Sequence, residues 1–403
     1  MNVLYVSYSC DPYNGTEDKL GWSIPEESSK RNNVTVVTKE EHRASIEKYM
    51  KIHPDLVIDV HYIDVPQIYK TVFRGFWYSM RMNIWNRRAF YVVKSLCEEK
   101  GIQIIHQVTP VEFRSIGNYG KIVNCKYICG PVGGAEYTPV ALKDYTKGHT
   151  YIENIRRAIN WLYRVYYSLT GRLSSCDYLM LANQETKEYL YSCIRSCETE
   201  VMTEIGVGLD EISLIKDSTS DIRVFLVAGR LIYRKGHKLL FDALKQLPKD
   251  LDYQCRIVGS GSEMQQLQDI CKNDPYLKKH VVFTGKIPYT QMEKEYKNAD
   301  VLIMPSLRET TGSVILEAMS KGIPVVTINK YGGRVILDSD VAWLYDGSTK
   351  DEIVGSLALK IQECILEPKE VVRKKQNAVN KVRQYSWKNR CEKYQKIYER
   401  VWQ

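Results

Sequence analysis

The sequence predicts an α/β protein with two doubly wound domains, each built on a parallel sheet. The chain has 403 residues, which is long for a single hydrophobic core. Strand-like and helix-like runs alternate along both halves, and this pattern is typical of parallel strands joined by crossover helices. A polar segment rich in Ser and Asp, residues 215–223, lies near the expected domain boundary. We expect a first domain over 1–208, a second over 209–385 and a terminal helix over 386–403 that crosses back to the first.

The strand-like runs of the first half are short and rich in β-branched and aromatic residues, as in NVLYVSY near the start. Segments with helical periodicity separate them, which favours crossover connections. The expected strands cover 2–8, 34–39, 56–63, 102–108, 125–134 and 178–183, and the expected helices cover 20–31, 41–50 and 70–99.

The second half repeats the alternation with shorter intervals, and it closes with an amphipathic helix capped by Ser386. Several of its strands run directly into glycine-containing loops. The expected strands cover 224–230, 253–261, 281–287, 301–306 and 324–329, and the expected helices cover 236–247, 262–273, 290–298, 312–321 and 386–402.

The formal net charge of +9 fits an anionic ligand, a membrane surface or nucleic acid. Residues 66–97 contain no carboxylate but hold six basic and eight aromatic residues, and residues 154–173 are similar. Helices of this composition can lie on anionic lipid with their rings at headgroup level. The alternative is a basic face on helices packed against their own domain. We expect a membrane-surface partner and no nucleic acid, because no nucleic-acid-binding motif accompanies the charge.

The sequence contains neither a run of about twenty apolar residues nor a basic region before an apolar leader. Eleven cysteines are present, and neither of the two close pairs has Cys-x-x-Cys spacing. We interpret the cysteines as reduced thiols of a cytoplasmic protein, and a zinc site is the alternative. If the basic helices touch a membrane, the protein would lie at the inner face of that membrane.

The stretch 301–329 predicts a strand, a loop, a helix and a strand. Ligands of doubly wound sheets bind beyond the carboxyl ends of the strands. Gly312 opens the helix, whose first amides favour an anion or hydroxyl oxygens. Glu309 lies in the loop and Glu317 lies in the helix, four positions after Ser313. Both carboxylates can then flank one polyhydroxylated ligand, although two solvated acids would give the same spacing.

Three further loops follow strands of the second half. Arg230 and Lys235 come after the first strand and form a candidate diphosphate clamp, although two solvated cations would fit the same pattern. Gly259 and Gly261 come after the second strand and would let a ligand touch backbone, or simply form a tight turn. Residues 286–288, with Lys286 and Ile287, follow the third strand and are placed to contact a nucleobase; a turn is again the alternative. Together the four loops describe a site for a nucleotide diphospho-sugar.

These motifs give the chain its family resemblance. The second half resembles the family 4 glycosyltransferases of the GT-B fold, whose two Rossmann-like domains face a cleft. The resemblance rests on GRLIYRKG, IVGSG, FTGKIP and ETTGSVILEAMSKGIPVVTINKYGG. The first half matches more loosely: CDPYNGTEDKLGW resembles a loop that approaches the donor phosphates, and GPVGGAEYTP resembles bacterial enzymes of surface-polysaccharide synthesis.

The resemblance implies a retaining transfer from a nucleotide-diphosphate sugar, with UDP or GDP as the nucleotide, no cofactor and no bound metal. Arg230 and Lys235 would stabilise the leaving diphosphate, Glu309 would contact sugar hydroxyls and Glu317 would hold the ribose. The first half would bind the acceptor, a sugar or a lipid-linked glycan used in capsule or O-antigen synthesis. Backbone donors are expected at Gly15, Thr16, Thr310, Thr311, Gly312 and Ser313.

The first half departs from the family pattern, because glycine and proline stand where many relatives have a histidine. His106 ends the strand that comes before the YICGPVGG strand, and it is the active-site candidate in place of the missing histidine. The alternative is a core histidine whose hydrogen bonds are made by backbone. Gly133, Gly134 and Glu136 are candidate acceptor contacts, and Glu136 could equally be a surface acid. The threonine before Gly312, where an aromatic residue is common, leaves the donor sugar open.

Three other functions remain open. The same fold could serve a soluble small-molecule acceptor, or the chain could bind sugar nucleotides without catalysis. A dinucleotide-dependent oxidoreductase is the third possibility, but no strand ends in a full G-x-G-x-x-G with an acid about twenty positions later.

Overall fold

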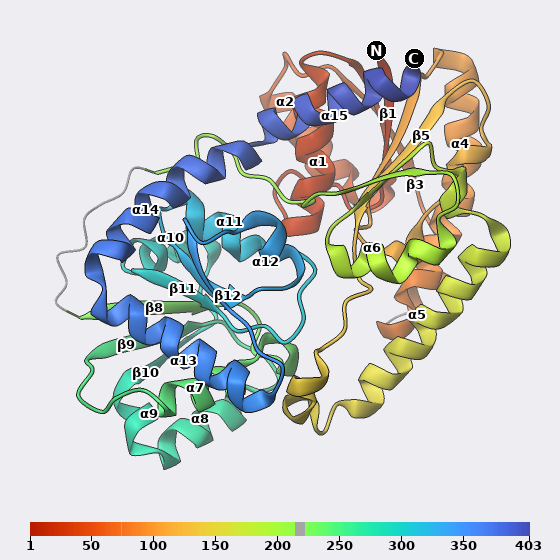
Figure 1. Ribbon diagram of the computed structural model, residues 1–403. Coiled ribbons are helices and arrows are strands. Elements are labelled where there is room, and N and C mark those ends of the chain that lie inside the picture. The colour runs from red at the N-terminus through yellow and green to blue at the C-terminus, as the bar shows by residue number, and fades with distance from the viewer. Residues whose placement is uncertain (74, 214–221) are drawn as a thin grey trace. The chain divides into compact units, whose positions relative to one another are not determined.

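The computed structural model describes residues 1–73, 75–213 and 222–403. The chain forms two compact units (Figure 1). Most of the expected boundary segment, residues 215–221, lies outside the described residues. The first unit comprises Met1–Ala135, Ile152–Gly206 and Trp387–Gln403, and the second comprises Glu136–Tyr151 and Val207–Ser386.

The first unit is built on a parallel sheet of seven strands in the order β3-β2-β1-β4-β5-β6-β7. The winding direction therefore reverses between β1 and β4. The six strands predicted in this half are confirmed, and β7 is additional. The strands are β1 (Asn2–Ser7), β2 (Asn33–Lys39), β3 (Ile58–Ile63), β4 (Ile104–Thr109), β5 (Lys126–Val132), β6 (Tyr178–Leu181) and β7 (Glu198–Val201).

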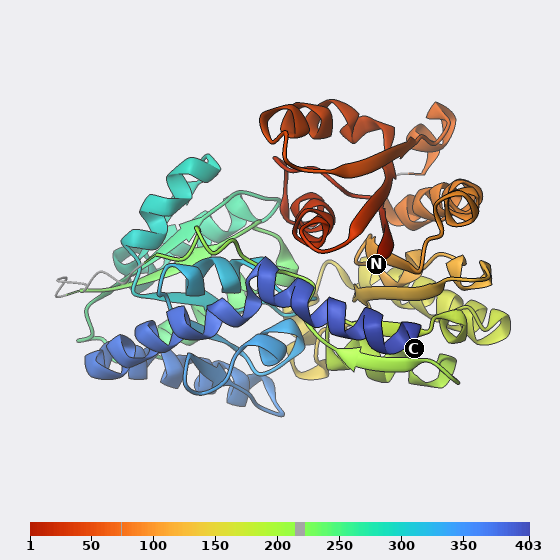
Figure 2. The same ribbon diagram turned by 90° about the horizontal axis from the view of Figure 1, so that it is seen from above.

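Helices of the first unit include two long ones, α4 and α5, which carry the basic aromatic stretches. The terminal helix α15 packs against α1: Arg31 pairs with Glu392 at 2.8 Å and Asn32 donates to Gln395 at 2.8 Å. Both termini accordingly lie at the same end of the first unit (Figure 2). The helices are α1 (Thr16–Ser29), α2 (Arg43–Ile52), α3 (Gln67–Val72), α4 (Tyr78–Lys100), α5 (Thr150–Thr170), α6 (Gln184–Leu190) and α15 (Trp387–Trp402).

The second unit is built on a parallel sheet of six strands in the order β10-β9-β8-β11-β12-β13. Its winding reverses between β8 and β11, so the loops after these two strands border the switch point. All five predicted strands are confirmed, and β13 is additional. The strands are β8 (Arg223–Ala228), β9 (Tyr253–Val258), β10 (Val281–Gly285), β11 (Val301–Met304), β12 (Val325–Ile328) and β13 (Ala342–Tyr345).

Four helices of the second unit, α7, α8, α10 and α11, lie close to their predicted positions, and α9, α12, α13 and α14 are additional. They are α7 (His237–Lys245), α8 (Met264–Asn273), α9 (Pro275–His280), α10 (Tyr289–Lys297), α11 (Ser313–Ser320), α12 (Tyr331–Ile336), α13 (Lys350–Leu366) and α14 (Pro368–Val382). Two doubly wound parallel sheets confirm the predicted fold class.

Residues 136–151 pack within the second unit, although the sequence division placed them in the first domain. Leu142 and Tyr145 are buried in the second core, and the Tyr145 hydroxyl donates to Asp242 at 2.7 Å. The His149 ring stacks on Tyr233 with centroids 4.1 Å apart. Because these side chains are buried in the second core, residues 136–151 belong to the second unit, although in the sequence they lie between two parts of the first unit.

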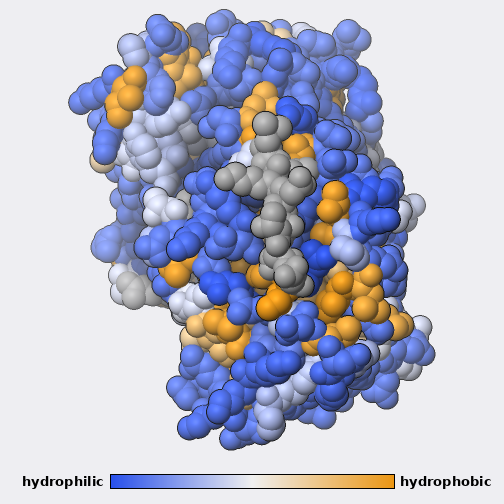
Figure 3. All heavy atoms as spheres, turned by 90° about the vertical axis from the view of Figure 1, so that its left-hand side faces the viewer, coloured by the Kyte–Doolittle hydropathy of each residue, from blue (hydrophilic) through white to orange (hydrophobic). Residues whose placement is uncertain are grey.

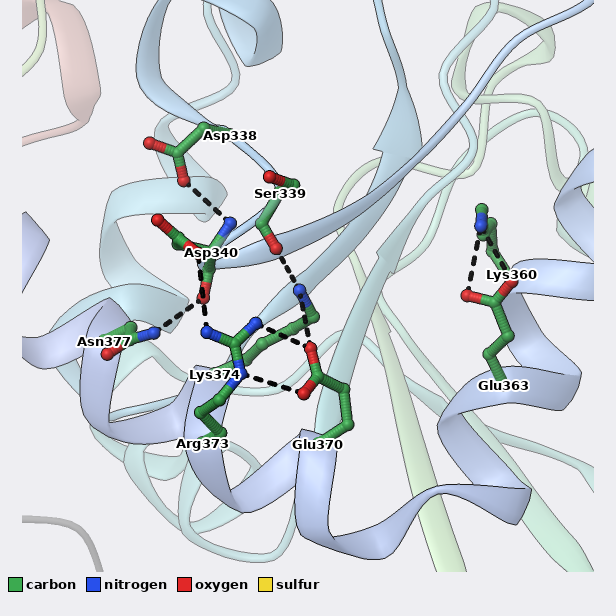
Figure 4. Close-up of polar contacts among 9 residues, drawn as sticks. All are labelled: Asp338, Ser339, Asp340, Lys360, Glu363, Glu370, Arg373, Lys374 and Asn377. Atoms are coloured by element: carbon green, nitrogen blue, oxygen red, sulfur yellow. Dashed lines mark hydrogen bonds and ion pairs between the residues drawn. The ribbon is translucent and has the colours of Figure 1, made fainter.

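Helix α14 is fastened to the turn that precedes β13. Arg373 pairs with Glu370 at 2.7 Å and with Asp340 at 3.4 Å, Lys374 donates to the Ser339 carbonyl, and Asn377 donates to the Asp340 carbonyl (Figure 4). Hydrophilic residues cover most of the face on which α14 lies, with hydrophobic residues in small scattered groups (Figure 3).

All eleven cysteines are unpaired thiols. Over residues 1–73, 75–213 and 222–403, no helix is long and apolar enough to cross a bilayer. Over the same residues, no group of three or more His, Cys, Asp or Glu side chains is placed to hold a metal ion.

Candidate functional site

The loops after β8 and β11 touch at the switch point of the second sheet. Gly236 ends the first of these loops with φ +72°, and a Cβ there would lie 2.0 Å from the Pro305 carbonyl oxygen. The Leu307 amide donates to the Arg234 carbonyl at 2.9 Å. Only glycine permits this approach at residue 236, so the GRLIYRKG motif brings its cations against the loop that carries Glu309.

An ion-pair cluster links these two loops. The Lys235 ammonium donates to Glu309 Oε2, and Arg234 Nη1 lies 3.6 Å from Glu309 Oε1. Burial raises the pKa of Glu309, but Lys235 and Arg234 outweigh it and hold that pKa below its usual value. Glu309 is therefore a carboxylate at neutral pH. Sequence reasoning identified Lys235 and Glu309 but missed Arg234, although it adjoins Lys235 in the motif.

Arg230, the other predicted clamp residue, is exposed directly after β8. Within the described part of the chain its guanidinium makes no ion pair, so the structure does not bring it to Glu309. An exposed arginine at the carboxyl end of a strand beside the switch point remains available to an anionic ligand.

Gly259 and Gly261 are required by backbone packing. Gly259 has φ +139°, and a Cβ there would lie 1.8 Å from the Gly229 carbonyl oxygen. A Cβ on Gly261 would lie 2.3 Å from the Leu231 carbonyl oxygen. These glycines let the loop after β9 support the loop after β8, which accounts for the IVGSG motif without a ligand.

The loop before α11 is closely packed. Gly312 caps α11 with φ +83°, Thr311 is buried, and the Thr310 hydroxyl donates to Glu136 Oε2 at 3.4 Å. Ser313 begins the helix and is half-buried. The predicted backbone donors of residues 310–313 thus lie at the N-terminal end of α11, a helix of eight residues. They follow Glu309 directly in the chain.

Glu317 lies on α11 one turn after Ser313 and is half-buried. Its Oε2 accepts a hydrogen bond from the Tyr296 hydroxyl at 2.9 Å, and Tyr296 is a buried residue of α10. Glu317 is therefore an oriented carboxylate. Tyr296 was missed because nothing in the local pattern of α10 indicates a partner twenty-one residues away.

Tyr331 and Gly332 support the same loop from α12. Tyr331 has φ +59°, and its hydroxyl lies 2.8 Å from the Tyr137 carbonyl oxygen and 3.0 Å from that of Leu307. A Cβ on Gly332 would lie 2.2 Å from the Thr311 Cα. The KYGG end of the motif therefore serves the geometry of the Glu309 loop.

The remaining donor candidates are two residues after β10 and two residues at the start of α1. Lys286 is exposed and Ile287 half-buried after β10, the edge strand two positions from β8. Gly15 and Thr16 are exposed where α1 begins, and Gly15 has φ +35°. These two residues belong to the first unit.

The three predicted acceptor contacts divide between the units. Gly133 exchanges backbone hydrogen bonds with Val111 and Phe113, and the Gly134 carbonyl accepts from Arg156 at 2.5 Å, all within the first unit. Glu136 is 1% exposed and belongs to the second unit. The surface-acid alternative for Glu136 is wrong, because its carboxylate is buried where Thr310 reaches it.

His106 occupies the core of the first unit, and its predicted active-site role is corrected. It is 0% exposed. Its Nε2 donates to the Gly130 carbonyl at 2.8 Å, and its Nδ1 accepts from the Tyr398 hydroxyl at 2.6 Å. The neighbouring Tyr5 and Tyr394 rings complete its surroundings. The alternative of a core histidine therefore holds, because the terminal helix supplies a partner that its sequence position does not reveal.

The buried His106 should make the fold sensitive to acid. Burial lowers the pKa of His106 to about 4, whereas the unfolded chain takes up that proton near pH 6.5. Stability should therefore fall as pH drops from 6.5 towards 4. The free energy of unfolding can be measured with urea between pH 7.5 and 4.5. We expect its change with pH to be smaller in His106→Gln than in the unmodified protein, by up to roughly 1.4 kcal/mol per pH unit. Equal slopes in both proteins would contradict this assignment.

The ion-pair cluster lies in the part of the chain that matches a known protein family. Residues 210–381 match the family Glycosyl transferases group 1. An uncharacterized glycosyltransferase of Methanocaldococcus jannaschii is 36% identical over 127 residues, 31% of this chain and 32% of that protein. The GDP-mannose-dependent alpha-(1-6)-phosphatidylinositol monomannoside mannosyltransferase of Mycolicibacterium smegmatis is 34% identical over 146 residues, 34% of this chain and 38% of that protein. The chain thus spans about a third of the length of these relatives.

Solved structures extend the likeness to the whole fold. The Anabaena protein HepE in complex with UDP matches with a TM-score of 0.64 at 16% identity, over 99% of this chain and 100% of that chain. At this identity the likeness shows the fold alone. The family match over residues 210–381 covers the part of the chain that contains Lys235, Glu309 and Glu317.

Proposed function

We propose that this protein is a glycosyltransferase that moves a sugar from a nucleotide-diphosphate donor to an acceptor hydroxyl. The observation that carries the proposal is the cluster of Lys235, Arg234 and Glu309 at the switch point of the second sheet. Two cations and a carboxylate fit a donor that carries both a diphosphate and sugar hydroxyls. The family match over 210–381 supports the same conclusion.

The chemistry follows from the charge that develops when the glycosyl–phosphate bond breaks. Negative charge grows on the leaving diphosphate, and Lys235 with the exposed Arg230 would stabilise it. On donor binding the diphosphate would replace Glu309 as a partner of Lys235. The Glu309 carboxylate would then accept hydrogen bonds from sugar hydroxyls, while Glu317 would accept those of the ribose. We propose retention at the anomeric carbon without a bound metal, on the family resemblance.

We propose a lipid-linked glycan as the acceptor, used in surface-polysaccharide synthesis at the inner face of the membrane. The two basic aromatic stretches support this, as does the similarity to a mannosyltransferase that is named for a phosphatidylinositol monomannoside. A soluble acceptor is the second candidate. Buried aromatic residues in α4 and α5 would favour it. Tyr91 and Trp161 are exposed, whereas Trp85 and Tyr167 are buried.

A thermal-shift screen tests the donor assignment. The purified protein would be heated with UDP, GDP, ADP, CMP, dTDP, NAD and their sugar conjugates, with and without a chelator. A ligand at a hundred times its Kd should stabilise the fold by about 2.7 kcal/mol. We expect UDP or GDP to raise Tm in the presence of chelator. A response to NAD alone, or to no nucleotide, would contradict the proposal.

Glu317→Gln should weaken nucleotide binding about tenfold, which corresponds to about 1.4 kcal/mol in binding free energy. The reason is that an amide is neutral and has one acceptor oxygen where the carboxylate has two. Tyr296→Phe removes one hydrogen bond to Glu317 and should cost about 1 kcal/mol or less in binding. Calorimetric titration with the nucleotide that responds in the screen measures both. An unchanged Kd for Glu317→Gln would exclude Glu317 from the ribose site.

A further inference from the structure

We propose that the first unit contains a binding site for a lipid phosphate, in a cavity lined by α4 and α5 and by the loops that follow β4 and α5. The cavity has a volume of about 750 Å³. Residues of both basic aromatic stretches, which lie far apart in the sequence, line it. A volume of this size is typical of small-molecule sites in proteins. The inference concerns the first unit only and stands independently of the donor site.

The cavity walls are apolar and aromatic. Met80, Ile84 and Phe90 of α4 line one side, and Leu162 and Tyr166 of α5 line the other. Such a lining suits hydrocarbon, which gains free energy by leaving water.

Two neutral polar side chains in the lining, Asn83 and Asn86 of α4, are already engaged by the protein. Asn83 Nδ2 lies within hydrogen-bond distance of the Ser79 and Arg114 carbonyls, at 2.8 and 2.9 Å. Asn86 donates to the Ser115 carbonyl at 2.7 Å and accepts from the Tyr119 hydroxyl at 2.9 Å. These two amides therefore hold the cavity wall in place.

The charged lining is entirely basic. Arg87, Lys121 and Arg172 line the cavity, and no Asp or Glu stands among the described residues that do so. Arg172 is held by the Ile116 carbonyl at 3.2 Å and lies over the Tyr166 ring at 5.0 Å. Arg87 and Lys121 are exposed. Uncompensated cations beside an apolar cavity match a ligand with an anionic head and an apolar chain.

Apolar side chains continue from the cavity onto the exposed surface of the same helices. Leu162 is 57% exposed, and Trp161 and Leu169 on α5 and Tyr91 on α4 are exposed as well. Large apolar side chains gathered beside cations are typical of a surface that meets lipid headgroups.

The occupant is a lipid with a phosphate headgroup: its chain lies between α4 and α5, and its phosphate lies near Arg87, Lys121 and Arg172. Two sources share this chemistry, a membrane phospholipid and a polyprenyl phosphate. If the second is bound, the cavity also supplies the anchoring site for the lipid-linked acceptor proposed above.

Binding to the full chain can be measured with two probes, phosphatidylglycerol nanodiscs and undecaprenyl phosphate in neutral detergent. Polyprenol without phosphate, inorganic phosphate and phosphatidylcholine nanodiscs serve as comparison ligands. We expect at least one probe to bind, at least tenfold more tightly than its comparison ligands. Binding of undecaprenyl phosphate alone would support the proposal with the polyprenyl source, and binding of phosphatidylglycerol would support it with the membrane source. Binding of neither probe would overturn it.

Two variants separate the cavity from general surface charge. Leu162→Glu and Lys121→Glu alter exposed lining residues, and each should weaken binding at least tenfold. The matched controls Leu359→Glu and Lys297→Glu alter exposed residues of the second unit and should leave binding within twofold. Equal binding by all four variants would overturn the proposal. The nucleotide thermal shift of each variant tests the donor site separately, so failure of one proposal is distinguishable from failure of the other.

Discussion

Lys235→Ala is expected to lower kcat/KM for sugar transfer by roughly 10²–10³-fold, about 2.7–4 kcal/mol in transition-state stabilisation. The ammonium would balance the charge that grows on the leaving diphosphate, and it lies in the loop that Gly236 holds against the Glu309 loop. Nucleotide binding should weaken as well, since the diphosphate is charged before the bond breaks. Initial rates with the donor identified by thermal shift measure the effect.

The matched control is Lys297→Ala, since Lys297 forms an exposed pair with Glu293 and should not affect turnover. Glu309→Ala provides the complementary result: transfer should be abolished while nucleotide affinity stays within a few-fold, because Glu309 is assigned to the sugar. Loss of nucleotide affinity without loss of turnover would exclude that role for Glu309. A Lys235→Ala rate within threefold of the unmodified protein would remove Lys235 from the diphosphate site.

Asp300→Ala is expected to destabilise the protein by about 3–5 kcal/mol, because it leaves a buried cation unpaired. Asp300 is 1% exposed just before β11, and Lys375 of α14 is 6% exposed. The Lys375 ammonium lies 2.9 Å and Arg223 Nη1 lies 3.3 Å from Asp300 Oδ1, and the Val224 amide donates to Oδ2 at 2.9 Å. One carboxylate therefore joins β8, β11 and α14. Urea unfolding at pH 7 measures the loss.

Asp338→Ala is the control, because Asp338 pairs with Lys381 at the surface and should cost about 0–1 kcal/mol. The double variant Asp300→Ala/Lys375→Met should recover part of the loss by removing the unpaired charge. Burial raises the pKa of Asp300, but Lys375 and Arg223 outweigh it and hold that pKa below its usual value. This contribution is therefore present above the ordinary carboxyl pKa and fades as pH falls through the lowered one. Equal costs for Asp300→Ala and Asp338→Ala would contradict the prediction.

The places of Lys235 and Glu309 in the candidate site could be predicted because both residues follow strands in a repeated local pattern. Lys235 and Glu309 each follow a strand of the second sheet, and parallel strands bring their carboxyl ends to one edge. That the two side chains pair with one another, with Arg234 beside them, could not be predicted, because it depends on the approach of two loops at Gly236. Tyr296 escaped prediction for the same reason, since α10 and α11 meet only in the folded chain.

The sequence by itself determined the two doubly wound sheets, since strand propensity, helical period and glycine at strand ends are local properties that adjacent residues carry. Only the tertiary structure decided which side chains are buried and by what. His106 became a core residue because Tyr398 reaches it across almost three hundred positions, and residues 136–151 joined the second unit through Leu142 and Tyr145. The cavity lined by α4 and α5 arises likewise from packing between distant segments, which no local pattern encodes.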